Sequence, residues 1–344
     1  MARRRASNRL ADAGHRLRHF SYPTDHIRDL YELLLARLGI RISHFSPPKD
    51  SLIFLNSADS VVPARLVGPA WMLFAGLCWT TMAILVRQLS GDYTAFELLF
   101  FRNLVAVLIL LPTMMRAGIS TLRTNRFPLH CLRAFFSCLA VLGLYYGIGQ
   151  APLPDVTALS FAQPLFGVVL AALVLKEFVD FARWRAVFFG FVGILVILRP
   201  GFADINIAIL TVLGSALCYA SGNICVKRLM TTDTPNQAVI YFNVLMMPLA
   251  LLPTLYFWVT PTLGDLALMI GIGLCGTATI YGYAASFNAA DVSAVMPFDF
   301  MRLPMAAAGA FLLFGELGDI WTWVGSGVIF ASAWVLARSE GKRG

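Results

Sequence analysis

Ten stretches between Leu66 and Ala337 are long and apolar enough to cross a lipid bilayer. Each covers roughly 15–23 residues, against the roughly 20 that a helix needs to cross a hydrocarbon core of about 30 Å. Charged residues make up only 13% of the chain, whereas water-soluble globular proteins carry about 25%. The spans lack the alternation of barrel strands, so we expect an all-α polytopic membrane protein with ten transmembrane helices. The expected spans are 66–86, 94–115, 129–149, 155–175, 184–198, 207–226, 237–259, 266–286, 292–314 and 320–337.

Lys and Arg are distributed unevenly between the loops that connect these spans. With the N-terminus inside the cell, the inner loops and the C-terminal tail hold eleven of them, and the outer loops hold only Arg87 and Arg199. Positive residues favour the cytoplasmic side, so we expect both termini in the cytoplasm. The net charge of +8 follows mainly from this topology and from the N-terminal segment, and we expect no nucleic-acid partner.

Residues 1–65 form a basic N-terminal extension that holds eleven of the 27 Lys and Arg residues. No apolar run follows Arg3, Arg4 and Arg5, so the segment does not read as a signal peptide. Residues 24–38 have the apolar spacing of an amphipathic helix that would lie on the inner leaflet. The alternatives are a cytosolic extension without a role in transport, a start codon placed too early, and an Arg-rich presequence.

The second five spans repeat features of the first five. Residues 77–79 and 86–89 match residues 217–219 and 226–229, residues 155–158 match residues 291–294, and Glu177 with Trp184 matches Glu316 with Trp323. Five spans are an odd number, so the two halves are expected to be upside down relative to each other. Inverted repeats are a recurring transporter architecture with the substrate site near the midplane. The expected units are residues 66–199 and 207–338, followed by a cytosolic tail at 339–344.

These features together resemble the drug/metabolite transporter superfamily in its EamA-type ten-span branch. The segments that carry the resemblance are 100–104, 158–166, 175–177, 198–200, 297–303 and 314–316. The resemblance implies two EamA-like five-helix repeats and transport by alternating access. It also implies substrates such as amino acids and amines, S-adenosylmethionine or riboflavin, and it includes exporters.

Charged residues inside the spans are the strongest candidates for a functional site, because an unpaired charge there costs several kcal/mol. Arg102 lies well inside the second span, and Arg302 lies near the middle of the ninth span, three residues after Asp299. We expect these three residues and Arg133 to contact substrate. Asp299 and Glu97 are the candidate protonation sites. The structural alternatives are a permanent Asp299–Arg302 ion pair, anchoring of Arg102 to backbone carbonyls, and extension of Arg133 and Glu97 toward the interface.

Aromatic residues gather in the first and third spans of each half. A cavity lined by them suits a planar or amphipathic solute whose orientation is fixed by hydroxyl groups. The alternative is the belt of aromatic residues at the membrane interface. The predicted members of the cavity are Trp79, Tyr145, Tyr219, Tyr281 and the polar Asn243.

The sequence therefore predicts a secondary transporter of a small organic metabolite in the cell inner membrane, driven by proton coupling or exchange. The substrate is expected to be amino-acid-like, S-adenosylmethionine-like or flavin-like, with an anionic group. A broad-specificity exporter, a channel and an intramembrane enzyme are the alternatives, although no catalytic motif supports the enzyme and no Walker A motif is present. The expected partners are the substrate and the lipid bilayer, with a homodimer left open. No cofactor and no metal are expected.

Overall fold

The computed structural model describes residues 64–117, 124–199 and 207–340. The proposed helix at 24–38 and the rest of the N-terminal extension before residue 64 lie outside these ranges. The described residues form twelve α-helices and no strand. The helices of the first half are α3 (Ala64–Leu89), α4 (Ala95–Ala117), α5 (Phe127–Gln150), α6 (Leu153–Ser160), α7 (Gln163–Val174) and α8 (Phe181–Leu198). Those of the second half are α9 (Ile207–Leu229), α10 (Pro235–Tyr256), α11 (Leu263–Ala289), α12 (Val292–Asp299), α13 (Arg302–Phe314) and α14 (Ile320–Glu340).

Nine segments of the described chain are long and apolar enough to span a membrane. Two of them, Leu153–Val174 and Ala294–Phe314, combine two helices each, α6 with α7 and α12 with α13. The tenth predicted span falls in α14, whose apolar part, Ile320–Leu336, is shorter than the other nine. The protein is thus an all-helical membrane protein, and the count of ten spans stays a prediction.

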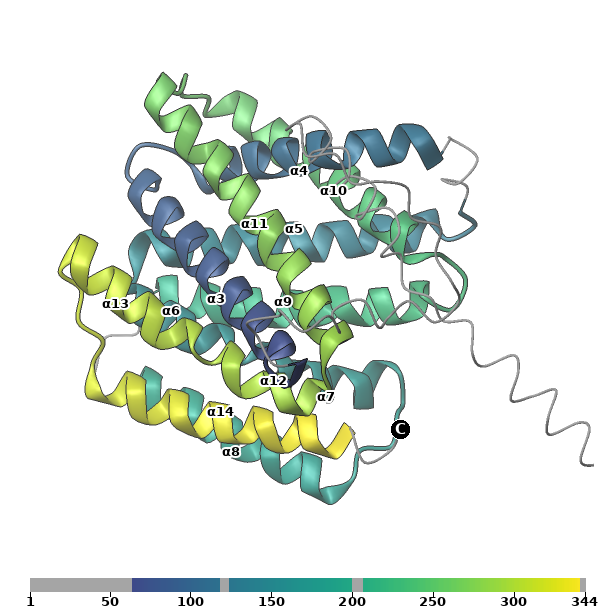
Figure 1. The fold of residues 1–344 in the computed structure, drawn as a ribbon, viewed down its shortest axis with the longest axis vertical. Coiled ribbons are helices and arrows are strands. Elements are labelled where there is room, and N and C mark those ends of the chain that lie inside the picture. Colours follow the sequence, from purple (N-terminus) through teal and green to yellow (C-terminus); the bar gives the residue numbers. More distant parts are fainter. Residues whose placement is uncertain (1–63, 118–123, 200–206, 341–344) are drawn as a thin grey trace, which may run out of the picture.

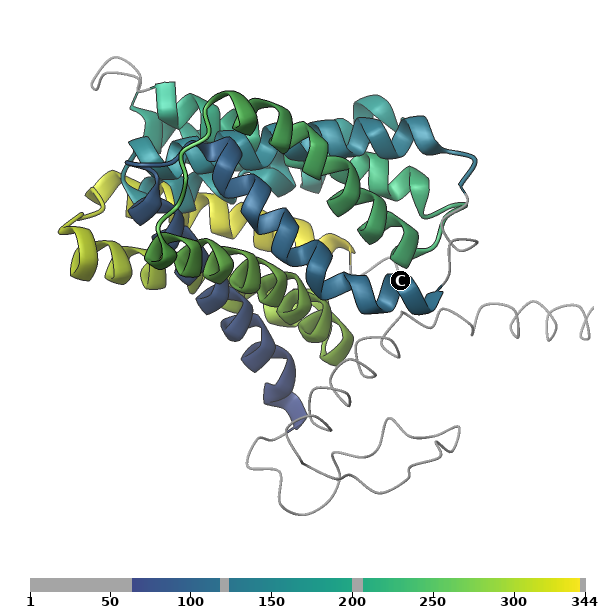
Figure 2. The same ribbon diagram turned by 90° about the horizontal axis from the view of Figure 1, so that it is seen from above.

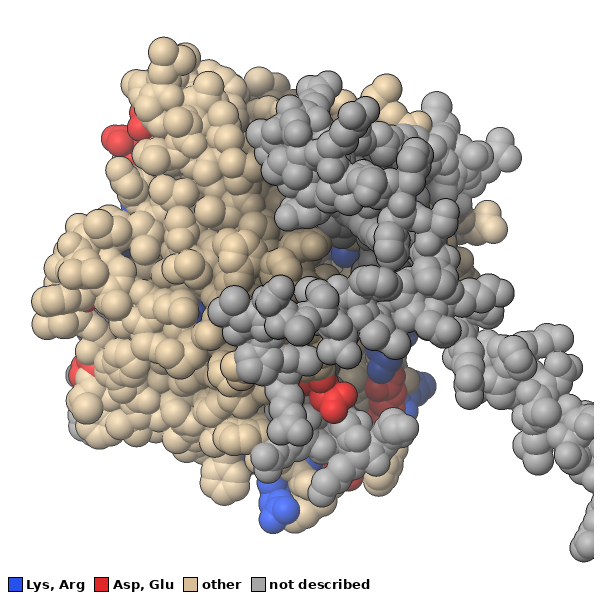
Figure 3. Space-filling model, viewed as in Figure 1, with Lys and Arg blue, Asp and Glu red and all other residues tan. Residues whose placement is uncertain are grey.

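The surface of the helix bundle is as apolar as a lipid environment requires. Large side chains such as Phe188, Leu252 and Leu312 are 65%, 71% and 77% exposed. Apart from the residues drawn in grey, the face in Figure 3 carries few acidic or basic side chains. Exposed apolar surface of this extent is unfavourable in water but favourable against lipid tails.

Three of the main helix contacts of one half recur when the two halves are exchanged. The contact of α3 with α11 corresponds to the contact of α9 with α5, because α3 and α5 of the first half correspond to α9 and α11 of the second. The second pair is α13 on α3 and α7 on α9, and the third is α12 on α3 and α6 on α9. Figures 1 and 2 show α3 crossing the bundle beside α11. Each half therefore provides the packing partner for the first helix of the other half.

The fourth and ninth predicted spans are both broken at the centre of the bundle. At each break the backbone makes short i to i−3 hydrogen bonds, from Ala162 to Leu159 at 3.0 Å and from Leu303 to Phe300 at 3.0 Å. Pro164 and Pro304 follow the breaks, and proline has no N–H to continue the α-helical pattern. The same offset of 139 residues relates the ends of α6 and α12 and the starts of α7 and α13.

The two ends of the bundle are named here by the helices that finish there. The α3 end holds the C-terminal ends of α3, α5 and α13, and the α9 end holds those of α7, α9 and α14. In Figure 1 the turn between α13 and α14 lies at the left, and the C-terminal end of α14 lies at the right.

Candidate functional site

A cavity of about 580 Å³ lies at the centre of the bundle, between the two halves and beside both helix breaks. Its wall includes Arg102 on α4, Tyr145 on α5, Tyr219 on α9 and Trp79 on α3. It continues past Asn223, Phe287 and Trp334, which lie close to the C-terminal ends of α9, α11 and α14. The cavity therefore extends from the middle of the bundle toward the α9 end.

A polar cluster joins the two helix breaks inside this cavity. The Tyr283 hydroxyl donates a hydrogen bond to Asp299 Oδ1 at 2.6 Å and accepts one from Arg302 Nη1 at 3.3 Å. Arg302 Nη2 donates to Ser160 Oγ at 3.4 Å. The Arg302 guanidinium carbon also lies 4.0 Å from the centre of the Phe161 ring and 5.0 Å from that of Trp79. Tyr283 thus bridges Asp299 and Arg302. The structural alternative considered from the sequence was a direct ion pair between these two residues.

The second arginine of the cavity is held differently. Arg102 Nη1 is buried and has no hydrogen-bond partner among the described residues. Its guanidinium interacts electrostatically with the phenol groups of Tyr145 and Tyr219. A Cβ atom at Gly276 would lie 3.0 Å from Arg102 Nε, so a glycine at this place on α11 leaves room for the arginine side chain.

Aromatic rings form a continuous wall on one side of the cavity. Phe161 and Phe300, one from each helix break, have ring centroids 4.8 Å apart. Phe300 then contacts Phe330 at 4.4 Å, and Phe330 contacts Trp334 at 5.7 Å. Ring faces arranged in this way bind flat apolar groups and cations.

Six of the nine distinct residues predicted to contact substrate line the cavity: Trp79, Arg102, Tyr145, Tyr219, Asp299 and Arg302. The other three lie elsewhere. Tyr281 is 40% exposed and packs edge-on against Trp71, Asn243 donates to the Val239 carbonyl on its own helix, and Arg133 donates to the Ala238 carbonyl at 2.7 Å.

Glu97, predicted as a protonation site, is fully buried near the start of α4 and does not line the cavity. Its carboxylate oxygens lie beside the backbone of Val259 and have no close hydrogen-bond partner among the described residues.

Several cavity residues were not among the predicted site residues. Tyr283, Ser160, Phe161 and Phe300 form the cluster and the wall, and Gln163 and Asn223 add amide groups. The internal repeat could have pointed to three of them. Ser160, Phe161 and Gln163 occupy the positions in the first half that correspond to Asp299, Phe300 and Arg302 in the second.

An ion pair joins the two halves at each end of the bundle. At the α3 end Arg87 pairs with Glu316; their side chains are 22% and 17% exposed. Arg87 also donates to the Ile148 carbonyl at 2.8 Å, and Glu316 accepts from the Leu153 amide at 3.0 Å.

At the α9 end Lys227 pairs with Glu177 at 2.6 Å, and these side chains are 58% and 42% exposed. Offsets of 140 and 139 residues relate Arg87 to Lys227 and Glu177 to Glu316, so the two pairs occupy corresponding positions of the two halves.

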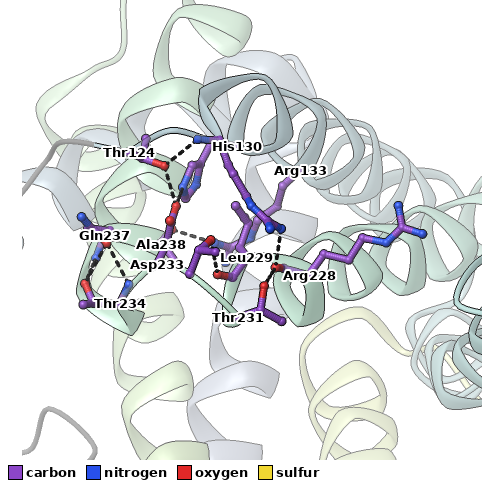
Figure 4. A network of polar contacts seen from close by, with 12 residues as sticks. Thr124, His130, Arg133, Arg228, Leu229, Thr231, Asp233, Thr234, Gln237 and Ala238 are labelled. Atoms are coloured by element: carbon purple, nitrogen blue, oxygen red, sulfur yellow. Dashed lines mark hydrogen bonds and ion pairs between the residues drawn. The ribbon is translucent and has the colours of Figure 1, made fainter.

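A second network at the α9 end joins α5 to the turn between α9 and α10 (Figure 4). Asp233 accepts hydrogen bonds from Thr124 Oγ1 at 2.6 Å and from His130 Nε2 at 2.7 Å. Burial acts to raise the pKa of the Asp233 carboxyl, but these hydrogen bonds outweigh it and hold the pKa below its ordinary value. The network fastens the first half to the second at this end.

A smaller cavity of about 410 Å³ lies at the α3 end, beside the turn between α3 and α4. Tyr145 lines this cavity as well as the central one. The Tyr145 side chain, which is 2% exposed and contacts Met82 Sδ at 3.8 Å, therefore separates the two spaces. Within the described ranges, no group of three His, Cys, Asp or Glu residues is arranged to hold a metal ion.

Residues 66–199 match the model of the EamA-like transporter family. A riboflavin transporter of Vibrio cholerae is 32% identical to this chain, over 81% of the chain and 95% of that protein. The chain belongs to the EamA-like transporter family. The resemblance stated from the sequence is thereby confirmed, and this EamA-like protein is a multi-pass metabolite transporter rather than an enzyme.

Other relatives of this EamA-like transporter have different names. An S-adenosylmethionine uptake transporter of Rickettsia prowazekii is 27% identical over 83% of this chain and 97% of its own length. A pseudopaline exporter of Pseudomonas aeruginosa is 24% identical over 78% of this chain and 95% of its own length. A solved structure described only as "Crystal structure of protein" has a TM-score of 0.55 at 17% identity, covers 79% of this chain and 98% of that one, and shares the fold.

Proposed function

We propose that this chain is a secondary transporter that moves a small organic metabolite across the inner membrane by alternating access. The observation that carries the proposal is the central cavity, which brings charged and aromatic side chains of both halves together at two broken helices. Broken helices near the midplane expose backbone and side-chain groups to a solute without exposing them to lipid.

The two halves, residues 66–199 and 207–338, act as inverted repeats in this proposal. The packing pattern that survives exchange of the halves supports it, as do the corresponding ion pairs at opposite ends. With both termini in the cytoplasm, the α3 end faces outward and the α9 end faces inward. The described conformation is then closed on the outside by Tyr145 and the Arg87–Glu316 pair, with its cavity directed inward.

Transport exchanges the roles of the two ends. Arg87 and Glu316 contact the turn between α5 and α6 in addition to each other, whereas Lys227 and Glu177 pair exposed to solvent. In the outward-facing state the second pair closes on the corresponding turn between α11 and α12, and the first pair separates from its turn. Symmetry of the repeats gives the two states similar free energies, which a reversible carrier requires.

The proposed substrates are amino-acid-like, S-adenosylmethionine-like or flavin-like metabolites. The names of the riboflavin and S-adenosylmethionine transporters support this range, and a cavity walled by Trp79, Phe161 and Phe300 suits a flat ring. Export is the second candidate, which the similarity to a pseudopaline exporter favours. Proton coupling would act through Asp299, since this carboxyl group lies in the cavity. If transport is not coupled to protons, exchange of one substrate molecule for another drives it.

Uptake into sealed proteoliposomes tests the proposal. Vesicles that contain the purified protein should accumulate riboflavin or S-adenosylmethionine, and Arg302→Gln should abolish accumulation while the protein still inserts and elutes as a single species. Arg133→Gln is the matched control, because it removes an intramembrane arginine outside the cavity. Accumulation that follows an imposed pH gradient identifies proton coupling, and accumulation only against internal substrate identifies exchange. Equal loss in both variants, or normal uptake by Arg302→Gln, contradicts the site.

A further inference from the structure

The two arginines of the cavity differ in how their guanidinium groups are occupied. Both terminal nitrogens of Arg302 donate hydrogen bonds, to Tyr283 and Ser160, and its plane lies against two aromatic rings. Asp299 balances its charge through the bridging Tyr283 hydroxyl. Of its three guanidinium nitrogens, only Nε lacks a partner among the described residues, and Nε is the inner nitrogen of the group. Arg302 is therefore largely satisfied by the protein itself.

Arg102 has no comparable set of partners. The ion pairs within the described residues do not include it, and its buried Nη1 makes no hydrogen bond there. A cationic group inside a membrane is strongly unfavourable unless an anion or water compensates it. The cavity wall holds two arginines and one aspartate, which leaves one positive charge uncompensated.

Two phenol groups lie beside the Arg102 guanidinium. Tyr145 on α5 and Tyr219 on α9 both line the cavity and interact electrostatically with Arg102. Among the described residues the Tyr145 hydroxyl donates one hydrogen bond, to Met82 Sδ at 3.8 Å, and sulfur is a weak acceptor. Three donors from three helices thus line one part of the cavity, and the missing side chain at Gly276 leaves the space that the Arg102 guanidinium occupies.

We infer that this cradle of Arg102, Tyr145 and Tyr219 binds a carboxylate or phosphate of the transported metabolite. The flat part of the same molecule then lies along the rings of Phe161, Phe300 and Phe330. This inference rests on the proposed transport function and narrows its substrate to compounds that combine a ring with an anionic group. Arg302 becomes a positioning residue that holds the two helix breaks together, and Arg102 becomes the residue that selects for charge.

Matched pairs of probes test the inference. Riboflavin 5′-phosphate differs from riboflavin by one phosphate, and S-adenosylmethionine differs from its decarboxylated form by one carboxylate. Competition with a radiolabelled member of each pair is measured in proteoliposomes for the wild type, Arg102→Gln, Arg102→Lys and Tyr219→Phe. A charge-assisted hydrogen bond contributes enough for about a 10-fold to 100-fold preference. The wild type should prefer the anionic member of at least one pair by that factor. A preference in the riboflavin pair identifies phosphate as the bound group, and a preference in the S-adenosylmethionine pair identifies carboxylate.

The variants separate charge recognition from folding. Arg102→Gln should remove the preference for the anionic member of the pair, and Arg102→Lys should retain part of that preference. Tyr219→Phe, which keeps the packing of the ring, should reduce the preference by about threefold to tenfold. A wild type that transports both members of each pair equally overturns the inference and leaves the proposed function intact. A preference that survives in Arg102→Gln also overturns it, whereas absence of any flux is a failure of the proposed function.

Discussion

Arg87 and Glu316 are 229 residues apart in the chain and form an ion pair at the α3 end of the bundle. Lys227 and Glu177 form the corresponding pair at the α9 end. The first pair is largely buried and bonded to the backbone of a neighbouring turn, and the second is largely exposed. The two ends of the transporter are therefore held with unequal strength in this conformation, although they use the same residue positions.

Glu316→Gln should open the α3 end, because it removes the charge that holds Arg87 and weakens a partly buried contact. We expect a cysteine introduced at Ser215 in the cavity, in a background without native cysteines, to react at least severalfold faster with a membrane-impermeant maleimide added on the α3 side. The double exchange Arg87→Glu with Glu316→Arg should restore slow labelling in part. Glu177→Gln is the control, and it should change labelling from the α3 side little because its pair lies at the other end.

Tyr283→Phe should reduce transport at least tenfold, because it removes the hydroxyl that links Asp299 to Arg302 without changing the size of the ring. Tyr281→Phe, two residues earlier on the same helix, makes the same chemical change outside the cavity and should transport normally. Initial uptake rates in proteoliposomes with matched protein content compare the two. Similar rates for both variants would show that the bridge has no part in transport.

Gly325→Ala should destabilise the contact between α8 and α14. A Cβ atom at Gly325 would lie 2.6 Å from the Gly193 carbonyl oxygen, and overpacking of this kind costs about 1–3 kcal/mol. Gly327→Ala provides the control on the same helix, since no heavy atom lies within 4 Å of the added carbon. The midpoint of thermal unfolding in detergent should fall for the first variant and stay unchanged for the second. An unchanged midpoint in both would mean that the two helices separate at little cost.

Asp233→Asn should lower stability at neutral pH and have little effect in acid. The pKa of Asp233 lies below its ordinary value of 3.8, so its ionised form stabilises the folded state above about pH 4. That contribution is lost as the pH falls through the lowered folded-state pKa, when the wild-type carboxyl becomes neutral as well. Unfolding midpoints of the two proteins measured between pH 3 and pH 7 should therefore converge at the acidic end. A constant difference over that range would contradict the ionic role of the network.

The sequence was sufficient to predict the helical class, most of the spans, and the presence of Arg102 and Arg302 inside the bundle. It did not show which face of each helix meets the cavity. A membrane helix is apolar on the lipid face as well as on the packed face, so Tyr281 and Tyr283 look alike in sequence although one faces outward and the other the site. The rotation of α11 is instead set by close packing at Gly282, where a Cβ would lie 2.9 Å from that of Ala75.

The break in the fourth predicted span was also hidden. The ninth span carries Asp299 and Arg302 at its break, but the residues around Pro164 carry no charge and resemble an ordinary apolar helix. Phe161 corresponds to Phe300 in sequence, but the contact between the two breaks appears only once the chain is folded.

That contact between Phe161 and Phe300 limits how the protein can move. The rings belong to different halves and meet beside the cavity at the centre of the bundle. If one end opens while the other closes, the displacement is largest at the ends and smallest where the rings meet. The two phenylalanines then act as the pivot of this motion. A smaller side chain at either position would weaken the contact, so that opening of one end would no longer require closure of the other.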